Sequence, residues 1–247
     1  MRVLPLILAA LVPLGPALAT EDTCEAGTGL VPAEATLPRA AAALGERHSL
    51  DIVVLGTGSS ALPGPAGDRA AYPARLQAAL GQLLPGIALK VVPDIKARQT
   101  AAEMMEQEWQ RIAEQRPALV IWQSGTVDAI KGVDPDEFRA TLNQGVEMLQ
   151  AQGVDVVLMN MQYSPRTDAM ISIDAYADNM RWVALQHDVP LFDRFALMKH
   201  WTETGTFDLY DAGKNTDTAE RVHDCIGRLL AGLIAAAVKQ APAAETR

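Results

Sequence analysis

The chain has 247 residues, a formal net charge of -9 and 2 cysteines, and 49% of its residues are hydrophobic. This length suits one α/β domain with a single buried core. The acidic balance repels phosphodiester backbones, and no stripe of lysines and arginines with interleaved aromatic residues is present, so we expect no nucleic-acid binding.

The N-terminal segment, residues 1–19, has the pattern of a secretory signal peptide. Arg2 supplies a positive charge, an apolar stretch covers residues 4–14, and residues 17–19 form the small-x-small motif of a cleavage site. The stretch is too short, and too often interrupted by proline, to span a bilayer. We therefore expect cleavage before Thr20, no membrane span, and a periplasmic or secreted location.

The two cysteines, Cys24 and Cys225, lie near opposite ends of the exported chain. In an oxidising compartment an even number of cysteines favours a disulfide over free thiols, so we expect these two to pair. Neither belongs to a C-x-x-C motif, and the four histidines are scattered without metal-ligand spacing. The sequence predicts no metal and no cofactor.

Residues 20–49 are expected to form an extended leader packed on the domain, with one short helix at Pro38–Leu44. From residue 50 to residue 240, apolar runs rich in β-branched residues alternate with segments of helical periodicity. In chain order, the predicted elements are a strand at Leu50–Leu55, a helix at Tyr72–Leu84, a strand at Ile87–Val92 closed by Pro93, a helix with a Thr100–Glu103 capping box reaching Ile112, a strand at Ala118–Gln123, a helix at Asp134–Gln152, a strand at Val154–Met159, a helix at Asp174–His187, a strand at Val189–Phe192 and a helix at Asp217–Gln240. Residues 241–247 form a tail.

This alternation predicts parallel strands joined by right-handed crossovers, with helices on both faces of the sheet. The expected fold is a flavodoxin-like three-layer sandwich around a parallel five-stranded sheet, formed by residues 50–240. Ligands of such folds bind beyond the carboxyl ends of the strands. Trp109 and Trp182 lie at helical spacing and are expected in the core.

The loop after the first strand, Gly56–Ala61, matches the G-x-G-x-x-G/A pattern of dinucleotide-binding sites. Prolines and glycines at residues 63–67 break the helix that should receive the pyrophosphate. The acidic residue after the second strand, Asp94, lies further on than the ~20 residues expected. We therefore interpret this segment as a glycine-rich loop.

Several ordered blocks resemble the SGNH (GDSL) hydrolases: Ile52–Ser60, Tyr72–Leu76 and Val120–Thr126, while Asn160–Pro165 and Leu191–Trp201 are similar to a bacterial exported branch. The resemblance extends from about Cys24 to Ala237 and implies the SGNH hydrolase fold. In that family a serine after the first strand attacks an ester carbonyl, and a histidine oriented by an aspartate takes its proton. The serine amide, a glycine amide and an asparagine side chain stabilise the oxyanion.

Carried over position by position, the resemblance implies a degenerate active site. Gly58 stands at the nucleophile, Ile95 at a loop glycine and Val127 at the oxyanion asparagine. The aspartate and histidine of the family's D-x-x-H fall on Lys214 and Asp217. No residue of the catalytic set is intact in this register, which favours a non-catalytic protein.

A shifted register leaves an alternative open. Ser59 or Ser60 replaces the nucleophile, and Glu220 and His223 form an E-x-x-H pair. That arrangement implies an active esterase acting on a carbohydrate or lipid ester. Against it, Asp217 and Glu220 fit a capping box, which places His223 inside the last helix instead of the loop before it.

The leading hypothesis is an exported pseudoenzyme whose cleft binds an acylated glycan or an envelope partner protein, and a purely structural envelope protein stays open. Tyr163, His200 and Trp201 follow strand ends, so they are candidates for a platform on which sugars stack, although packing in the core is the competing interpretation. Asp128, in the block after the third strand, is a further candidate for ligand binding.

Overall fold

The computed structural model describes residues 24–32, 34–210 and 216–241, and the predicted signal peptide lies outside these ranges. Its centre is a sheet of 5 parallel strands in the order β2-β1-β3-β4-β5. This is the strand order of flavodoxin-like folds, so the predicted fold is confirmed. The strands are β1 (Ser49–Gly56), β2 (Ala88–Ile95), β3 (Leu119–Gln123), β4 (Asp155–Met159) and β5 (Leu191–Phe192).

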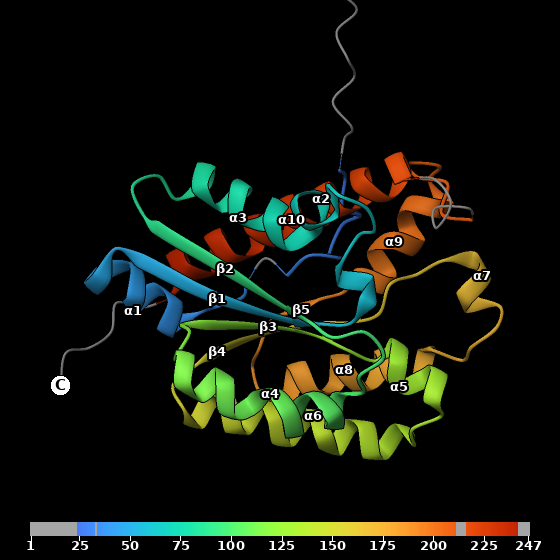
Figure 1. The fold of residues 1–247 in the computed structure, drawn as a ribbon, viewed down its shortest axis with the longest axis horizontal. Helices are drawn as coiled ribbons and strands as arrows, with labels where there is room; N and C mark the ends of the chain where they lie inside the picture. The colour runs from blue at the N-terminus through green and yellow to red at the C-terminus, as the bar shows by residue number, and fades with distance from the viewer. Residues whose placement is uncertain (1–23, 33, 211–215, 242–247) are drawn as a thin grey trace, which may run out of the picture.

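Helices cover both faces of the sheet (Figure 1). The helices are α1 (Pro38–Arg47), α2 (Gly67–Ala70), α3 (Tyr72–Leu83), α4 (Ala101–Gln115), α5 (Thr126–Lys131), α6 (Pro135–Ala151), α7 (Pro165–Asp168), α8 (Asp174–Gln186), α9 (Arg194–Glu203) and α10 (Thr216–Gln240). Helices α3 and α10 lie side by side over one face, and α4, α6 and α8 lie over the other. No helix in the described ranges has the length and hydropathy needed to cross a membrane.

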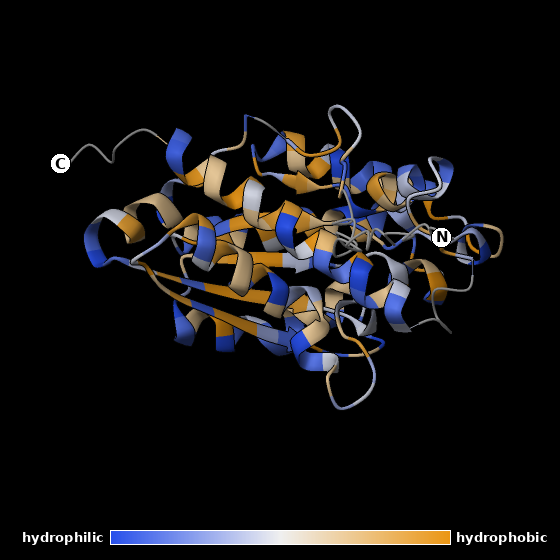
Figure 2. Ribbon diagram, turned by 90° about the horizontal axis from the view of Figure 1, so that it is seen from above, coloured by the Kyte–Doolittle hydropathy of each residue, from blue (hydrophilic) through white to orange (hydrophobic). Residues whose placement is uncertain are grey.

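The core lies between the sheet and its two helical layers. Every residue of β3 and β4 is buried, as expected for parallel strands covered on both faces. Figure 2 shows apolar residues along the strands and polar residues on the outer helical surfaces. Trp109 belongs to this core at 6% exposure, but Trp182 is 49% exposed on α8 and packs under the guanidinium of Arg139, which corrects its predicted place.

The predicted helix signals explain several observed boundaries. Thr100 and Glu103 form the capping box of α4, and the carboxylate of Asp134 accepts two backbone N–H groups at the start of α6. Strand β2 continues through Pro93 to Ile95, which corrects its predicted end. Because β2 is an edge strand, Pro93 removes no hydrogen bond that a second neighbour would need.

The leader is fixed to the domain through a cap that comes from far along the chain. Leu37 makes no side-chain bond at the start of α1. Instead, Asp155 Oδ2 on β4 accepts hydrogen bonds from the backbone N–H groups of Arg39 and Ala40, each at 2.9 Å. Burial raises the pKa of Asp155 to about 6, against the opposing effect of these two N–H groups.

This cap predicts a pH dependence of stability. The pKa of Asp155 rises from its ordinary 3.8 to about 6 on folding, so the folded chain holds the proton more tightly and stability falls as pH rises between these values. An Asp155→Asn variant keeps an oxygen acceptor and does not titrate. We expect the wild type to lose up to about 3 kcal/mol of unfolding free energy relative to this variant between pH 4 and pH 7. The measurement is urea unfolding of both proteins across this pH range. A difference in unfolding free energy between wild type and variant that does not change with pH would contradict the raised pKa of Asp155.

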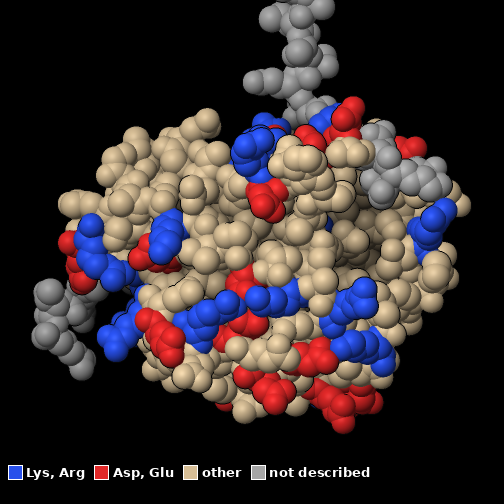
Figure 3. All heavy atoms as spheres, viewed as in Figure 1, with Lys and Arg blue, Asp and Glu red and all other residues tan. Residues whose placement is uncertain are grey.

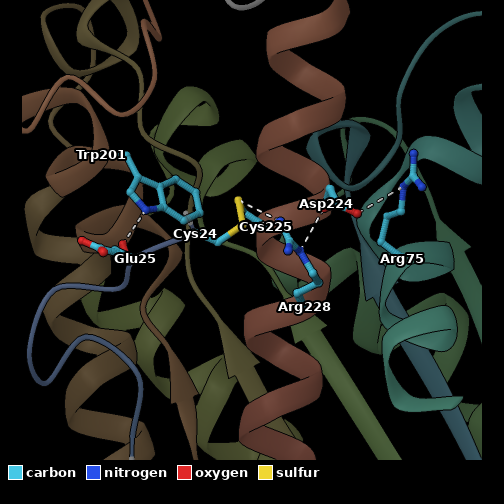
Figure 4. The surroundings of a disulfide bond; sticks show 7 residues. All are labelled: Cys24, Glu25, Arg75, Trp201, Asp224, Cys225 and Arg228. Atoms are coloured by element: carbon cyan, nitrogen blue, oxygen red, sulfur yellow. Dashed lines mark hydrogen bonds and ion pairs between the residues drawn. A yellow bond between two sulfur atoms is a disulfide. The ribbon is translucent and has the colours of Figure 1, made fainter. Parts of the chain in front are cut away.

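The disulfide predicted from the cysteine count is present. Cys24 is bonded to Cys225 on α10, with a Cα–Cα distance of 5.2 Å and a sequence separation of 201. Figure 4 shows the leader held beside α10 at this bond. Nearby, Trp201 Nε1 donates to the carbonyl of Glu25 at 2.9 Å, so a side chain of α9 also fastens the leader.

Removing this crosslink should destabilise the fold strongly, because it closes a loop of 201 residues in the unfolded chain. The Cys24→Ser/Cys225→Ser double variant is expected to lose roughly 2–5 kcal/mol of unfolding free energy. Denaturant unfolding with and without a reductant checks this: reductant should lower the wild-type midpoint and leave the double variant unchanged. Thiol titration of the unreduced, denatured wild type should find no free thiol, and two reactive thiols would contradict the pairing.

Candidate functional site at the carboxyl edge of the sheet

Two glycines at the end of β1 and in the loop after it, Gly56 and Gly58, differ in the space around them. A Cβ on Gly56 would lie 2.4 Å from Ser60 Oγ, so only glycine fits there, whereas a Cβ on Gly58 would meet its nearest atom, Cβ of Ala97, at 4.0 Å. Residues Gly58–Ser60 form a 3-10 turn, η1. Packing therefore requires the first glycine but leaves room for a side chain at the family's nucleophile position.

A fully buried glutamine at the end of β3 holds this loop. Gln123 Oε1 accepts hydrogen bonds from Thr57 N at 3.0 Å, Thr57 Oγ1 at 3.1 Å and Ser60 Oγ at 2.9 Å. Ser59 Oγ lies 3.4 Å from the same oxygen. A hydroxyl has one hydrogen to donate, so Ser60, which gives its hydrogen to Gln123, accepts one from the Tyr72 hydroxyl at 3.1 Å. The Ser60 hydroxyl is thus committed to the network that shapes the loop.

His223 lies on α10, as the sequence predicts, and faces the same network. Its Nδ1 accepts a hydrogen bond from the backbone N–H of Tyr72 at 3.0 Å, so the neutral ring carries its hydrogen on Nε2. Burial, and then the charge of Arg194, lower the pKa of His223 to about 3. Within the described residues no serine hydroxyl is hydrogen-bonded to this ring, so the structure brings Ser59, Ser60 and His223 to one region without joining them as a pair.

Arg194, at the first turn of α9, is a buried charged group of the site. Its side chain is 1% exposed. Its Nη2 donates to the Ser59 carbonyl at 3.0 Å and its Nη1 contacts Ser59 Oγ at 3.3 Å. Its guanidinium also lies over the Tyr72 ring at 5.9 Å. Burial lowers the pKa of Arg194 to about 10, so the group is charged at neutral pH.

Two cavities meet at this loop. The first, of about 440 Å³, is lined by residues that include Gly58, Ser59, Tyr163, Arg194 and His223. The second, of about 500 Å³, is lined by residues that include Gly58, Ser60 and Ile95. The first cavity is lined by Ser59 and His223, two residues of the alternative catalytic set, and by the buried cation, and it is therefore the candidate binding site.

The three candidates for a sugar-stacking platform lie in different surroundings in the structure. Tyr163 lines the first cavity, with its ring edge-on to Phe195 at 5.4 Å. Trp201 is fully buried, edge-on to Phe207, so it has no face for a sugar and its place as a stacking residue is corrected. His200 lies outside the cavity, against Gly27 of the leader.

Asp128 is also corrected, from a ligand-binding residue to a structural one. It is 1% exposed. Its Oδ1 accepts from the backbone N–H of Ala101 at 2.9 Å and its Oδ2 from that of Gly125 at 3.1 Å, so it ties α4 to α5. Burial raises the pKa of Asp128 despite these bonds.

The remaining family positions are placed as follows. Val127 is half-buried on α5 and is not among the residues lining the two cavities. Lys214 lies outside the described residues. Asp217 is exposed in the first turn of α10. This helix begins at Thr216, one residue before the predicted cap. Glu220 is half-buried on the same helix. In the described part of the chain, no three His, Cys, Asp or Glu side chains are grouped as a metal would need.

The sequence analysis missed four residues of this site: Tyr72, Gln123, Gln162 and Arg194. One signal was available, because Gln123 is a polar residue at the end of an otherwise apolar strand.

On the face drawn in Figure 3, basic and acidic side chains are interspersed, and the expectation that the chain binds no nucleic acid stays a prediction.

The match of a lipase-like family model to residues 23–240 supports the SGNH/GDSL hydrolase superfamily as the class of this protein, and the fold agrees with it. Within it, the chain belongs to the Non-GDSL lipase-like family, whose model matches residues 23–240. A comparison with curated proteins found no match.

Solved structures share the fold at low identity. TesA is 23% identical with a TM-score of 0.55, over 74% of this chain and 99% of that one. Axe2, an acetylxylan esterase from Geobacillus stearothermophilus, is 18% identical with a TM-score of 0.60, over 74% of this chain and 93% of that one. LAE5, an α/β hydrolase from the metagenome of Lake Arreo, Spain, is 21% identical with a TM-score of 0.56, over 73% and 96%. At these identities the likeness extends to the fold alone.

The Gln123 network predicts a stability effect. Replacing Gln123 by Leu leaves the Thr57 N–H and two hydroxyls without their acceptor, so we expect a loss of at least about 2 kcal/mol of unfolding free energy. The matched change Gln110→Leu, at an exposed position on α4, should alter stability by no more than about 0.5 kcal/mol. Equal effects of the two changes in urea unfolding would contradict the role given to Gln123.

Proposed function

We propose that this protein is an exported, non-catalytic member of its superfamily that binds a ligand in the first cavity. The observation that carries the proposal is the hydrogen bonding of His223. Its Nδ1 is occupied by the Tyr72 backbone N–H, and no described serine hydroxyl reaches the ring. A serine hydrolase needs a hydroxyl whose proton is taken by such a base, and this arrangement lacks that contact.

The chemistry of the neighbouring groups supports the same proposal. Burial and the charge of Arg194 together lower the pKa of His223 to about 3, and a base with such a pKa takes up a proton poorly at neutral pH. Gly58 brings no nucleophile, and Val127 offers no donor to an oxyanion. Catalysis would need several of these groups at once, since loss of single triad members already costs orders of magnitude in rate.

The alternative, an active esterase using Ser59 or Ser60 with His223, is favoured by one observation. Ser59 and His223 line the same cavity, so a rotation of the Ser59 side chain is the smallest conformational change toward a hydrogen-bonded serine–histidine pair. That step would break the contacts of Ser59 Oγ with Gln123 and Arg194. Ser60 is a weaker candidate because its buried hydroxyl already donates a hydrogen bond to Gln123 and accepts one from Tyr72.

For the ligand, we propose an acylated glycan or a partner protein of the cell envelope. Tyr163 supports this, as an aromatic residue lining the cavity. The signal-peptide pattern and the Cys24–Cys225 disulfide support export, because disulfides persist in oxidising compartments.

The proposal predicts that the purified protein does not hydrolyse p-nitrophenyl acetate above background and is not labelled by a fluorophosphonate. Gly58→Ser has room for its side chain, so it should fold and still show no turnover, because base and oxyanion donors are absent as well. Far-UV circular dichroism of the variant provides the folding control.

Two results would contradict this proposal. Labelling at Ser59 or Ser60 that is abolished by His223→Ala would establish the esterase alternative. Efficient turnover by Gly58→Ser would show that a working base lies near this position. Wild-type protein at the background rate in both assays, measured beside an active esterase as a positive control, is the expected result.

A further inference from the structure

The first cavity contains a buried cation, Arg194, that has no counter-ion within the described part of the chain. Arg194 makes hydrogen bonds to the Ser59 carbonyl, the Ser59 hydroxyl and the Gln162 side-chain oxygen, all of them neutral groups. Among the described residues, no aspartate or glutamate forms an ion pair with it. An isolated buried charge is costly, and buried charges in proteins are normally paired or bind a charged ligand.

The guanidinium also has hydrogen-bonding capacity to spare. It carries five N–H donors, and three bonds are formed, one from Nη1 and two from Nη2. Its Nε is buried without a partner. Small rotations of the side chain would direct the unused donors to an acceptor in the cavity. His223, which lines the same cavity, adds a neutral N–H at Nε2.

The rest of the cavity lining favours a ligand that combines a negatively charged group with an apolar portion. In a protein with a net charge of -9, none of the described residues that line this cavity is an aspartate or a glutamate. Among the described lining residues, Arg166 on α7 is a second cation, exposed and with its guanidinium 6.0 Å from the Tyr210 ring. Much of the wall is apolar and includes Leu62, Pro63, Met198, Leu209 and Val222.

We propose that this cavity binds an organic carboxylate, with Arg194 as the counter-ion of the carboxylate and the apolar wall around the body of the ligand. One buried guanidinium balances one negative charge, which favours a carboxylate over a phosphate monoester with a charge close to two at neutral pH. The inference rests on the proposed function, because it concerns the same non-catalytic site and narrows its ligand to one that presents a carboxylate group.

The test compares ligands that differ in charge but not in shape. Octanoate and octanamide are titrated into the purified full chain by calorimetry at pH 7.5. We expect octanoate to bind at least about 10-fold more tightly, as a charge-assisted hydrogen bond to a buried arginine would give. Equal affinities would overturn the inference. Octyl phosphate should bind no more tightly than octanoate, and tighter binding would overturn the choice of a carboxylate.

A variant locates the effect at Arg194. Arg194→Met should abolish the preference for octanoate while keeping octanamide affinity within about 3-fold, since the methionine preserves an apolar side chain of similar length. The matched control Arg139→Gln, at the exposed guanidinium beside Trp182, should leave both affinities unchanged. If Arg194→Met does not fold, the comparison of the two ligands on the wild type decides.

Failure of this inference and failure of the proposed function give different results. Ester turnover together with a preference for octanoate would overturn the non-catalytic proposal and support the anion site. Absence of turnover together with equal binding of octanoate and octanamide would overturn the anion site and support the non-catalytic proposal.

Discussion

The side chain of Gln123 fixes the loop that follows β1, and the rest of the site is built on that contact. Its carboxamide oxygen binds Thr57 and Ser60, and Ser60 in turn binds the Tyr72 hydroxyl. The backbone of Tyr72 then binds His223. The groups nearest to a catalytic set are thereby joined to the interior of the fold, and each hydroxyl or ring nitrogen used in this way is unavailable for proton transfer in the observed arrangement.

Arg194 contacts two residues of this loop and its network. It lies over Tyr72 and binds Ser59, so it closes the same loop from the side of α9. A buried charge without a carboxylate destabilises a fold unless something compensates, and conflicts of this kind are concentrated at functional sites. The neutral hydrogen-bond network and the cation, which is unpaired among the described residues, support the proposal that the pocket holds an anionic group and does not activate a serine.

Much of the fold follows from the sequence, because its signals are local and strong. The apolar runs give the five strands and their parallel arrangement, and the capping residues Thr100 and Asp134 give the starts of two helices. The cysteine count gives the disulfide. The short helices α2, α5 and α7 were not predicted, since four to six residues are too few to show a helical period.

The site was less predictable, because burial and pairing depend on tertiary contacts. Arg194 has no local feature that distinguishes it from a surface arginine, yet packing against Tyr72 buries it completely. Asp128 has the position of a ligand-binding residue but is used to join two helices. Trp182 fits the apolar periodicity of α8 and is nevertheless 49% exposed, with the guanidinium of Arg139 over its ring.

The protonation state of His223 tests the account most directly. Nitrogen-15 NMR of the purified protein, with the signal assigned by His223→Gln, reports which ring nitrogen carries the hydrogen. The account predicts an unprotonated Nδ1 and a protonated Nε2 that do not change between about pH 5 and pH 8. A ring that titrates with a midpoint near neutral pH would contradict it, because such a histidine would be able to act as the base of a serine hydrolase.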